Sequence, residues 1–232
     1  MPCTLPASLA DAAVCRGSFH AVLGGEAGEA VFADFSAALQ KAQAEGRILT
    51  ASLFRYENHL FFYAEGLNRP FTPQGLCPAL DAALLPWPPA LGEAAPRPWA
   101  AMQPYFYHDV PTTAADWQQG RCPQRRRGRI ALLPPDSWCS YMEHHLRIVT
   151  EGLVEGDRWH LICVQEGVLF SYLEEPRTNV NIKHRPGAHS PELDAWIAAD
   201  PESHFARFTP EQKAHPDSGH NFVFLPRIAA ED

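Results

Sequence analysis

The spacing of apolar positions changes in a regular order along the chain, and each change marks an expected element. Apolar residues recur at helical spacing over about residues 28–45 and again over about residues 136–153. Each of these stretches follows a short apolar run and precedes two longer ones of strand length. The turn signals Glu57-Asn58 and Glu166-Gly167 separate the two longer runs, which predicts two β-hairpins. The expected strands are residues 19–23, 48–56 and 59–65 in the first set and residues 129–133, 159–165 and 168–174 in the second.

This order of elements is an internal repeat. Phe32 aligns with Tyr141 and Leu60 with Leu169, in each case 109 residues apart (141 − 32 and 169 − 60). Each copy is also expected to contain a shorter second helix and a closing aromatic strand that ends in proline. These helices are predicted within residues 77–85 and within residues 190–199 or the segment just after them, and these strands at residues 105–111 and 221–226. The resulting order, β-α-β-β-α-β, is the ferredoxin-like motif, with both helices on one face of an antiparallel sheet.

A single ferredoxin-like sheet leaves one apolar face open to water, which costs about 25 cal/mol per Å². The runs at residues 48–56 and 159–165 are apolar on both alternating faces, as expected of sheets buried on both sides. The predicted fold class is therefore α+β, with two tandem ferredoxin-like halves packed sheet to sheet as an intramolecular dimeric α+β barrel. The predicted domains are residues 16–112 and 128–228, joined by a linker at residues 113–127.

Composition narrows the set of partners. The chain has 232 residues, of which 46% are hydrophobic and 20% charged, as in an ordinary globular protein. A formal net charge of −8 argues against binding to nucleic acid, and the cationic run at residues 121–129 is interpreted as a solvated linker. The six cysteines form no C-x-x-C pair, the N-terminus has no secretory signal, and no run approaches the ~18 apolar residues of a membrane span. We therefore expect a cytoplasmic monomer with reduced thiols and no membrane partner.

The helix expected at about residues 136–153 has a histidine within its apolar stripe. At about 100° per residue, Trp138, Met142 and Val149 lie near the centre of the stripe, and His145 falls inside it. A buried imidazole without hydrogen-bond partners costs roughly 1–3 kcal/mol. His145 is therefore either a satisfied core residue or a member of a functional pocket.

The residue one turn before His145 favours the functional interpretation. Tyr141 is at position i − 4 and shares the same helix face. On the neighbouring predicted strand, Tyr172 and Glu174 alternate onto one sheet face and are expected to bring a carboxylate toward the same space. In the first copy, the positions of Tyr141 and His145 are occupied by Phe32 and Ser36. One pocket, in the second half, is therefore predicted to hold an acid/base set.

These residues resemble those of a known family. The helix with Tyr141 and His145, the following hairpin and the closing "FVFLP" at residues 222–226 are similar to the L-rhamnose mutarotases, so that the chain looks like a tandem fusion of two such copies. The resemblance covers roughly the second half. Tandem tryptophans of that family have no counterpart here, and the nearest residues are His204 and Phe205.

The resemblance implies a sugar-binding isomerase that interconverts the anomers of an aldose by acid/base catalysis, without cofactor or metal. His145 would be the principal acid/base group, Tyr141 a second group and Glu174 their partner. The residues implied to bind the sugar are Trp159, His160, Tyr172, Trp196 and Phe205.

Other functions stay open at this point. The same fold serves non-catalytic small-molecule binding, haem binding and cofactor-free oxygenation of aromatic compounds, and fold alone does not select among them. Eight of the eleven histidines lie in the second half, yet none is in a helical H-x-x-x-H or H-E-x-x-H motif. The sequence therefore gives no positive indication of a metal or haem site.

Overall fold

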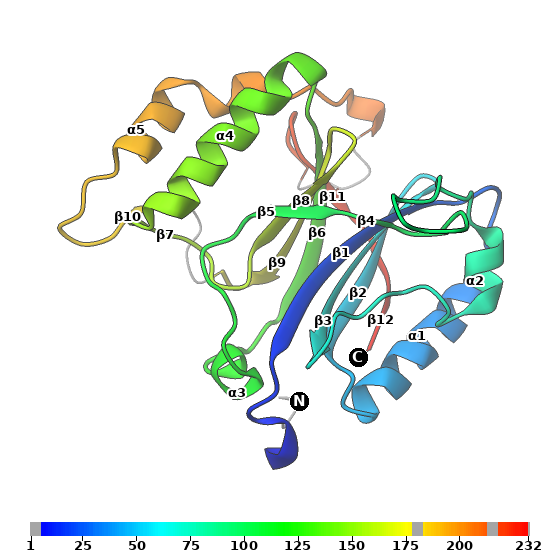
Figure 1. Cartoon of the computed structure of the whole chain (residues 1–232). Coiled ribbons are helices and arrows are strands. Elements are labelled where there is room, and N and C mark those ends of the chain that lie inside the picture. The colour runs from blue at the N-terminus through cyan, green and yellow to red at the C-terminus, as the bar shows by residue number, and fades with distance from the viewer. Residues whose placement is uncertain (1–5, 178–182, 213–217, 232) are drawn as a thin grey trace. The chain divides into compact units, whose positions relative to one another are not determined.

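A computed structural model describes residues 6–177, 183–212 and 218–231 of the chain. It divides into two compact units (Figure 1). Unit 1 comprises Met1–Met102, Pro111–Cys122 and Pro226–Asp232, and unit 2 comprises Gln103–Val110 and Pro123–Leu225. The chain therefore passes from one unit to the other four times. The segment expected as a linker, residues 113–127, contains the short helix α3 (Ala114–Gln118) and the first residues of a strand.

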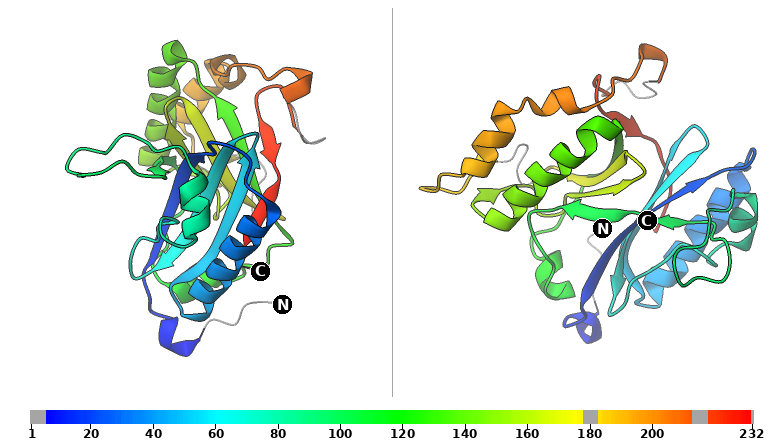
Figure 2. Two further views of the ribbon diagram at one scale, coloured as in Figure 1. Left: turned by 90° about the vertical axis from the view of Figure 1, so that its right-hand side faces the viewer. Right: turned by 45° about the horizontal axis from the view of Figure 1, so that its top comes forward.

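Unit 1 is an antiparallel sheet with helices on one face (Figures 1 and 2). Its strands, in the order β12-β2-β3-β1-β4, are β12 (Arg227–Ala230), β2 (Ile48–Tyr56), β3 (His59–Leu67), β1 (Val14–Val22) and β4 (Ala100–Ala101). Helix α1 (Glu29–Ala44) buries Phe32, Phe35, Leu39 and Ala42, whose three- and four-residue spacing forms one helix face. A short second helix, α2 (Pro78–Ala83), contributes the buried Leu80, and a 3₁₀ turn at Ala7–Leu9 precedes the sheet.

Unit 2 repeats this arrangement. Its sheet has the order β11-β6-β9-β8-β5, with strands β11 (Val223–Leu225), β6 (Arg125–Leu132), β9 (Val168–Glu175), β8 (Leu161–Gln165) and β5 (Gln103–Phe106). The helices α4 (Pro135–Glu151) and α5 (Pro191–Ala198) lie side by side in Figures 1 and 2. Two 3₁₀ turns (Pro201–His204 and Pro210–Gln212) and a small ladder of β7 (Val154–Glu155) with β10 (Lys183–His184) complete the unit.

The predicted α+β class with two tandem ferredoxin-like halves is confirmed, because four strands of each sheet have the ferredoxin-like order. The packing of one sheet upon the other stays a prediction. Among the described residues, no helix combines the length and the apolar character required to cross a bilayer.

The closing strand of the first half was placed wrongly. Residues 105–111 were expected to complete the first sheet, but β4 takes that place, and β5 instead joins unit 2, where Gln103 pairs with Val164. Conversely, β12 follows the second half in sequence and pairs with β2 of unit 1. Each added strand covers a sheet edge whose backbone groups would otherwise be unpaired. This exchange brings residues from the middle of the chain to the pocket of unit 2.

Candidate functional site

Helix α4 places the two residues singled out from the sequence on its buried side. Pro135 occupies the first turn, where a missing N–H is tolerated, and Gly152 ends the helix in the left-handed region with φ of 67°. Between them, Tyr141, His145 and Ile148 form the buried face. The rings of Tyr141 and His145 have centroids 4.1 Å apart.

These rings line a pocket of about 350 Å³ within unit 2, called here the unit 2 pocket. Its walls come from β5, β6, β8, α4, α5 and the loops at either end of the sheet. Its aromatic lining residues are Phe106, Tyr141, Trp196, Phe205 and Phe222, and its polar ones are His108, Arg129, His145, Asp157, His160, Arg177 and Glu202. Such a mixture of aromatic walls with a few convergent polar groups is typical of a small-molecule site.

His145 is held as a neutral imidazole with one nitrogen available. Its Nδ1 lies 2.9 Å from the carbonyl oxygen of Tyr141, which can only accept, so Nδ1 carries the hydrogen. Nε2 is then the acceptor nitrogen, and within the described part of the chain it makes no hydrogen bond. Burial lowers the pKa of His145 to about 4 and outweighs the opposite effect of the Tyr141 carbonyl. At neutral pH the ring is therefore uncharged, and the lone pair of Nε2 is available as an acceptor.

Aromatic rings fix the position of this imidazole. The centroids of Phe106 and Trp196 each lie 4.7 Å from that of His145, in edge-on arrangements, and Tyr105 lies at 5.6 Å. Edge-to-face packing at these distances stabilises ring pairs beyond simple burial. The ring is thus held rigidly, with little freedom to turn Nε2 away.

Tyr141 contributes a phenol that stays protonated. Burial raises the pKa of Tyr141 to about 12, and the neighbouring Tyr105 hydroxyl and Arg129 only partly oppose this. Trp196 and Phe205 pack against its ring at 5.3 and 5.1 Å. At neutral pH the hydroxyl is therefore a hydrogen-bond donor and not an anion.

The charged residues of the unit 2 pocket differ in how they are paired. Arg177 Nε lies 3.5 Å from Asp157 Oδ2, and the Glu202 carboxylate accepts a short hydrogen bond from Asn221 Nδ2. Arg129 has its guanidinium carbon 4.2 Å from the ring centroid of Phe222. Burial, together with the nearby Arg177, lowers the pKa of Arg129 to about 10, so that it keeps its charge at neutral pH.

A further histidine enters the pocket from the exchanged strand segment. His108 packs edge-on against Phe106, with ring centroids 4.8 Å apart. Burial lowers the pKa of His108 to about 4, an effect that Asp157 opposes and Arg177 reinforces. Gly156 makes room for this ring, because a Cβ at that position would lie 1.9 Å from His108 Cδ2.

Five of the eight residues predicted from sequence meet in this pocket: Tyr141, His145, His160, Trp196 and Phe205. The other three, Trp159, Tyr172 and Glu174, are buried but do not line it. Tyr172 donates a 2.6 Å hydrogen bond to Glu174, which also lies 3.5 Å from Arg126 Nε. Strand alternation explains this placement, because Leu169 belongs to the core beneath the helices, and Tyr172 and Glu174 therefore point to the opposite face.

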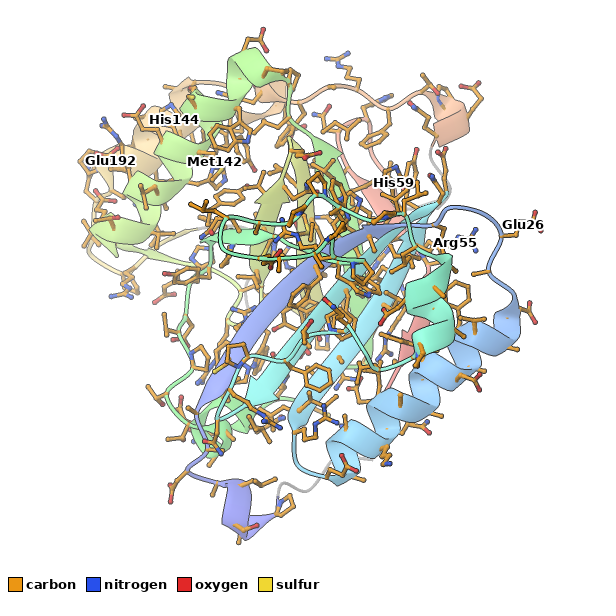
Figure 3. The ribbon with its side chains drawn as sticks, turned by 45° about the vertical axis from the view of Figure 1, so that its right-hand side comes forward. Glu26, Arg55, His59, Met142, His144 and Glu192 are labelled. Atoms are coloured by element: carbon orange, nitrogen blue, oxygen red, sulfur yellow. The ribbon has the colours of Figure 1, made fainter. Side chains whose placement is uncertain are left out.

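Several lining residues were not predicted from the sequence. Phe106 and His108 were assigned to the first half, and Arg129 was interpreted as part of a solvated cationic run. Asp157 and Arg177 lie in loops and Glu202 lies in the 3₁₀ turn Pro201–His204, where apolar spacing gives no signal. The histidine next to His145 does not line the pocket. Figure 3 labels this residue, His144, on α4, together with Met142 on the same helix.

Within the described ranges, no three His, Cys, Asp or Glu side chains are grouped so that they could hold a metal ion.

Comparison of the sequence with known protein families and with curated proteins finds no match. Among solved structures, a candidate monooxygenase from Fusobacterium nucleatum subsp. nucleatum is similar with a TM-score of 0.41 and 10% identity, over 95% of each chain. A candidate monooxygenase from Lactobacillus acidophilus has a TM-score of 0.38 and 6% identity, over 94% of this chain and 95% of the other.

The resemblance to the L-rhamnose mutarotase family is wrong. No model of that or any other family matches, and the similar solved structures are described as candidate monooxygenases. The resemblance depended on a Tyr-x-x-x-His spacing and a short closing strand, which many ferredoxin-like chains can share. At these TM-scores, the structural likeness in turn assigns no activity to this chain.

Proposed function

We propose that the unit 2 pocket binds a small, largely planar compound and that His145 removes a proton from it. This proposal is based mainly on the hydrogen bonding and neutral charge of the buried His145 ring. Its Nδ1 is committed to the Tyr141 carbonyl at 2.9 Å, and its Nε2 is left as an acceptor in a pocket with aromatic walls. A rigid neutral imidazole of this kind is a general base.

The proton transfer follows from the groups present. An acidic O–H or C–H of the bound compound faces Nε2, and its proton moves to that nitrogen. The resulting imidazolium donates through both nitrogens, to the Tyr141 carbonyl and to the anion just formed. The Tyr141 hydroxyl, which stays protonated because burial raises its pKa to about 12, donates to the developing negative charge. Arg129 adds a fixed positive charge in the same pocket.

The size and lining of the pocket favour a compound of one or two rings. A volume of about 350 Å³ is at the lower end of the range for ligand pockets. Phe106, Trp196, Phe205 and Phe222 present ring faces and edges on which a planar molecule can stack. Exchange of sugar anomers was implied by the mutarotase resemblance alone and is not proposed.

A second candidate, cofactor-free oxygenation, is favoured by the same aromatic lining. Removal of a proton from an aromatic substrate gives an electron-rich anion, which can react with molecular oxygen when it is shielded from water. Both candidates begin with the same proton transfer to His145. They differ in whether oxygen is consumed.

The test uses a matched pair of histidine variants. His145→Asn retains a donor near the position of Nδ1 and lacks Nε2, whereas His144→Asn changes the adjacent histidine, which does not line the pocket. The proteins are incubated in D2O with a panel of acidic one- and two-ring compounds, and C–H exchange is followed by NMR while an electrode records oxygen uptake. We expect exchange in the wild type and in His144→Asn, and a loss of about 10²-fold or more in His145→Asn.

Oxygen uptake that depends on His145 would select the oxygenase. Exchange at the wild-type rate in His145→Asn, with the ligand still bound, would contradict both candidates.

A further inference from the structure

The unit 2 pocket has a charged residue in a layer of side chains that unit 1 fills with phenylalanine. In unit 1, Ala21 pairs with Leu60, and two residues earlier Phe19 pairs with Phe62. The rings of Phe19 and Phe62 have centroids 6.3 Å apart within the core under the helices.

Unit 2 has the same register with different residues. Ala131 pairs with Leu169, and two residues earlier Arg129 pairs with Ser171. Ala131 and Leu169 belong to the core of unit 2, so strand alternation directs Arg129 and Ser171 to this same face. An aromatic pair in one unit is thus replaced by an arginine opposite a small residue in the other. The replacement puts a cation where hydrophobic packing alone would favour a ring.

Arg129 has no anionic partner among the residues that the structure describes. Its Nε is buried without a hydrogen-bond acceptor from the described residues, and none of their carboxylates lies within ion-pair distance of the guanidinium. The nearby acidic groups have other partners, since Asp157 faces Arg177 at 3.5 Å and Glu202 accepts from Asn221. Burying an arginine donor without an acceptor is unfavourable, and a guanidinium presents its N–H groups in a planar fork that matches a carboxylate.

We infer that the substrate of the unit 2 pocket carries a carboxylate, which Arg129 binds through its buried Nε and an adjacent amino group. This inference rests on the proposed function and deepens it, because it names the substrate class as small aromatic carboxylic acids. The carboxylate supplies the acceptor that the described residues do not, and the planar remainder stacks among Phe106, Trp196 and Phe222. Since Arg129 and His145 line one pocket, binding of the acid group places the ring beside Nε2.

The experiment compares two ligands of the same shape, 2-naphthoate and 2-naphthamide, which differ in charge at one group. Their dissociation constants are measured by calorimetry on the full chain and by quenching of tryptophan fluorescence. We expect the wild type to bind the carboxylate at least tenfold more tightly than the amide, Arg129→Gln to lose this preference, and Arg129→Lys to retain part of it.

Arg125→Gln is the matched control. Arg125 lies on the same strand, its side chain is 61% exposed, and it pairs with Glu175 at 3.7 Å outside the pocket. It should keep the wild-type preference. Should Arg129→Gln fail to fold, as judged by circular dichroism, the wild type and Arg129→Lys still decide the question.

Equal binding of the two ligands to the wild type, or an undiminished preference in Arg129→Gln, would overturn the inference. If proton exchange still depends on His145 after either of these results, the proposed function stands and only the inference about the carboxylate is lost. Failure of the wild type to bind either ligand, together with no His145-dependent exchange, would overturn both.

Discussion

At the scale of single residues, the two halves of the chain act as controls for each other. Phe32 and Ser36 on α1 occupy the repeat positions of Tyr141 and His145 on α4. Each unit packs a helix of this kind on its sheet, and α1 does so with Phe35 and no histidine on its buried face, so a histidine is not required for the fold. Because the buried imidazole of His145 stays neutral, the free energy of unfolding should depend on pH.

The first prediction concerns stability against acid. The pKa of His145 is lowered from 6.5 to about 4, so between these values the unfolded chain binds a proton that the folded chain does not. Stability contributed by the neutral ring is therefore fully present above pH 6.5 and is lost as the pH falls toward 4. Between pH 7 and pH 5, His145 should account for a loss of about 2 kcal/mol in the free energy of unfolding.

Urea denaturation at both pH values measures this loss. His145→Phe, which fills the same aromatic surroundings without titrating, should lose about 2 kcal/mol less than the wild type over this range. An equal loss in the two proteins would show that the ring is already solvated or charged in the folded state.

The second prediction concerns the space beside His108. In Gly156→Ala the new methyl group would occupy the position of the His108 ring, because the distance to Cδ2 would be 1.9 Å. We expect the ring to be displaced into the unit 2 pocket, with weaker binding of 2-naphthoate and a loss of about 1–3 kcal/mol in stability. Gly25→Ala is the control, since a Cβ there meets nothing within 4 Å. Equal binding by both variants would contradict the placement of His108.

At the scale of elements, helix α5 has a capped N-terminus that stabilises it and side chains that line the unit 2 pocket. Ser190 caps it by accepting a hydrogen bond from Leu193 N at 3.0 Å, and the helix contributes Leu193 and Trp196 to the pocket lining. In unit 1, Thr113 caps α3 in the same way, accepting from Asp116 N at 3.2 Å, and α3 contributes nothing to the pocket.

The third prediction compares these two caps. Ser190→Ala and Thr113→Ala should each lower the free energy of unfolding by about 1 kcal/mol. Only Ser190→Ala should also weaken ligand binding, because it frees the first turn of the helix that holds Trp196. Thermal melting and calorimetry measure the two effects. A loss of binding in Thr113→Ala of the same size would mean that binding follows overall stability and not the position of α5.

The main helices and hairpins were predictable from sequence because their apolar spacing is strong and local. The pairing partner of β5 could not be predicted, because strand pairing depends on which sheet edge is available. The sequence of a strand of four residues does not indicate which sheet it joins. Tyr141 and His145 were predictable as neighbours since four residues make one helical turn. Glu174 was not placed correctly by pattern, since β9 is apolar on both faces and alternation alone does not say which face the helices cover.

At the scale of the whole molecule, the exchanged strands join the two units along the chain, and we expect this to couple their stabilities. The strand β12 is held in unit 1 by Glu231, which accepts hydrogen bonds from Thr50 Oγ1 at 2.5 Å and from Ala51 N at 3.0 Å. The chain leading into β12 leaves unit 2 directly after β11. Loss of either edge strand should therefore disturb both sheets.

The fourth prediction follows from this connection. Glu231→Ala leaves two buried donors without an acceptor and should destabilise the protein by about 1–3 kcal/mol. Hydrogen exchange should show protection falling together in the β2–β3 and β8–β9 hairpins, whereas Glu26→Ala, at an exposed position, should change neither. Loss of protection confined to β2 would mean that the units unfold independently.

The protonation state of His145 decides whether this residue can act as the proposed base. Ring ¹⁵N chemical shifts, followed by NMR from pH 3.5 to 8 with and without 2-naphthoate, report which nitrogen carries the hydrogen. We expect a neutral ring at pH 7 with the hydrogen on Nδ1, a midpoint near pH 4, and a ligand-induced change at Nε2. A ring protonated on Nε2, or one that titrates near pH 6.5 and does not respond to ligand, would contradict this expectation.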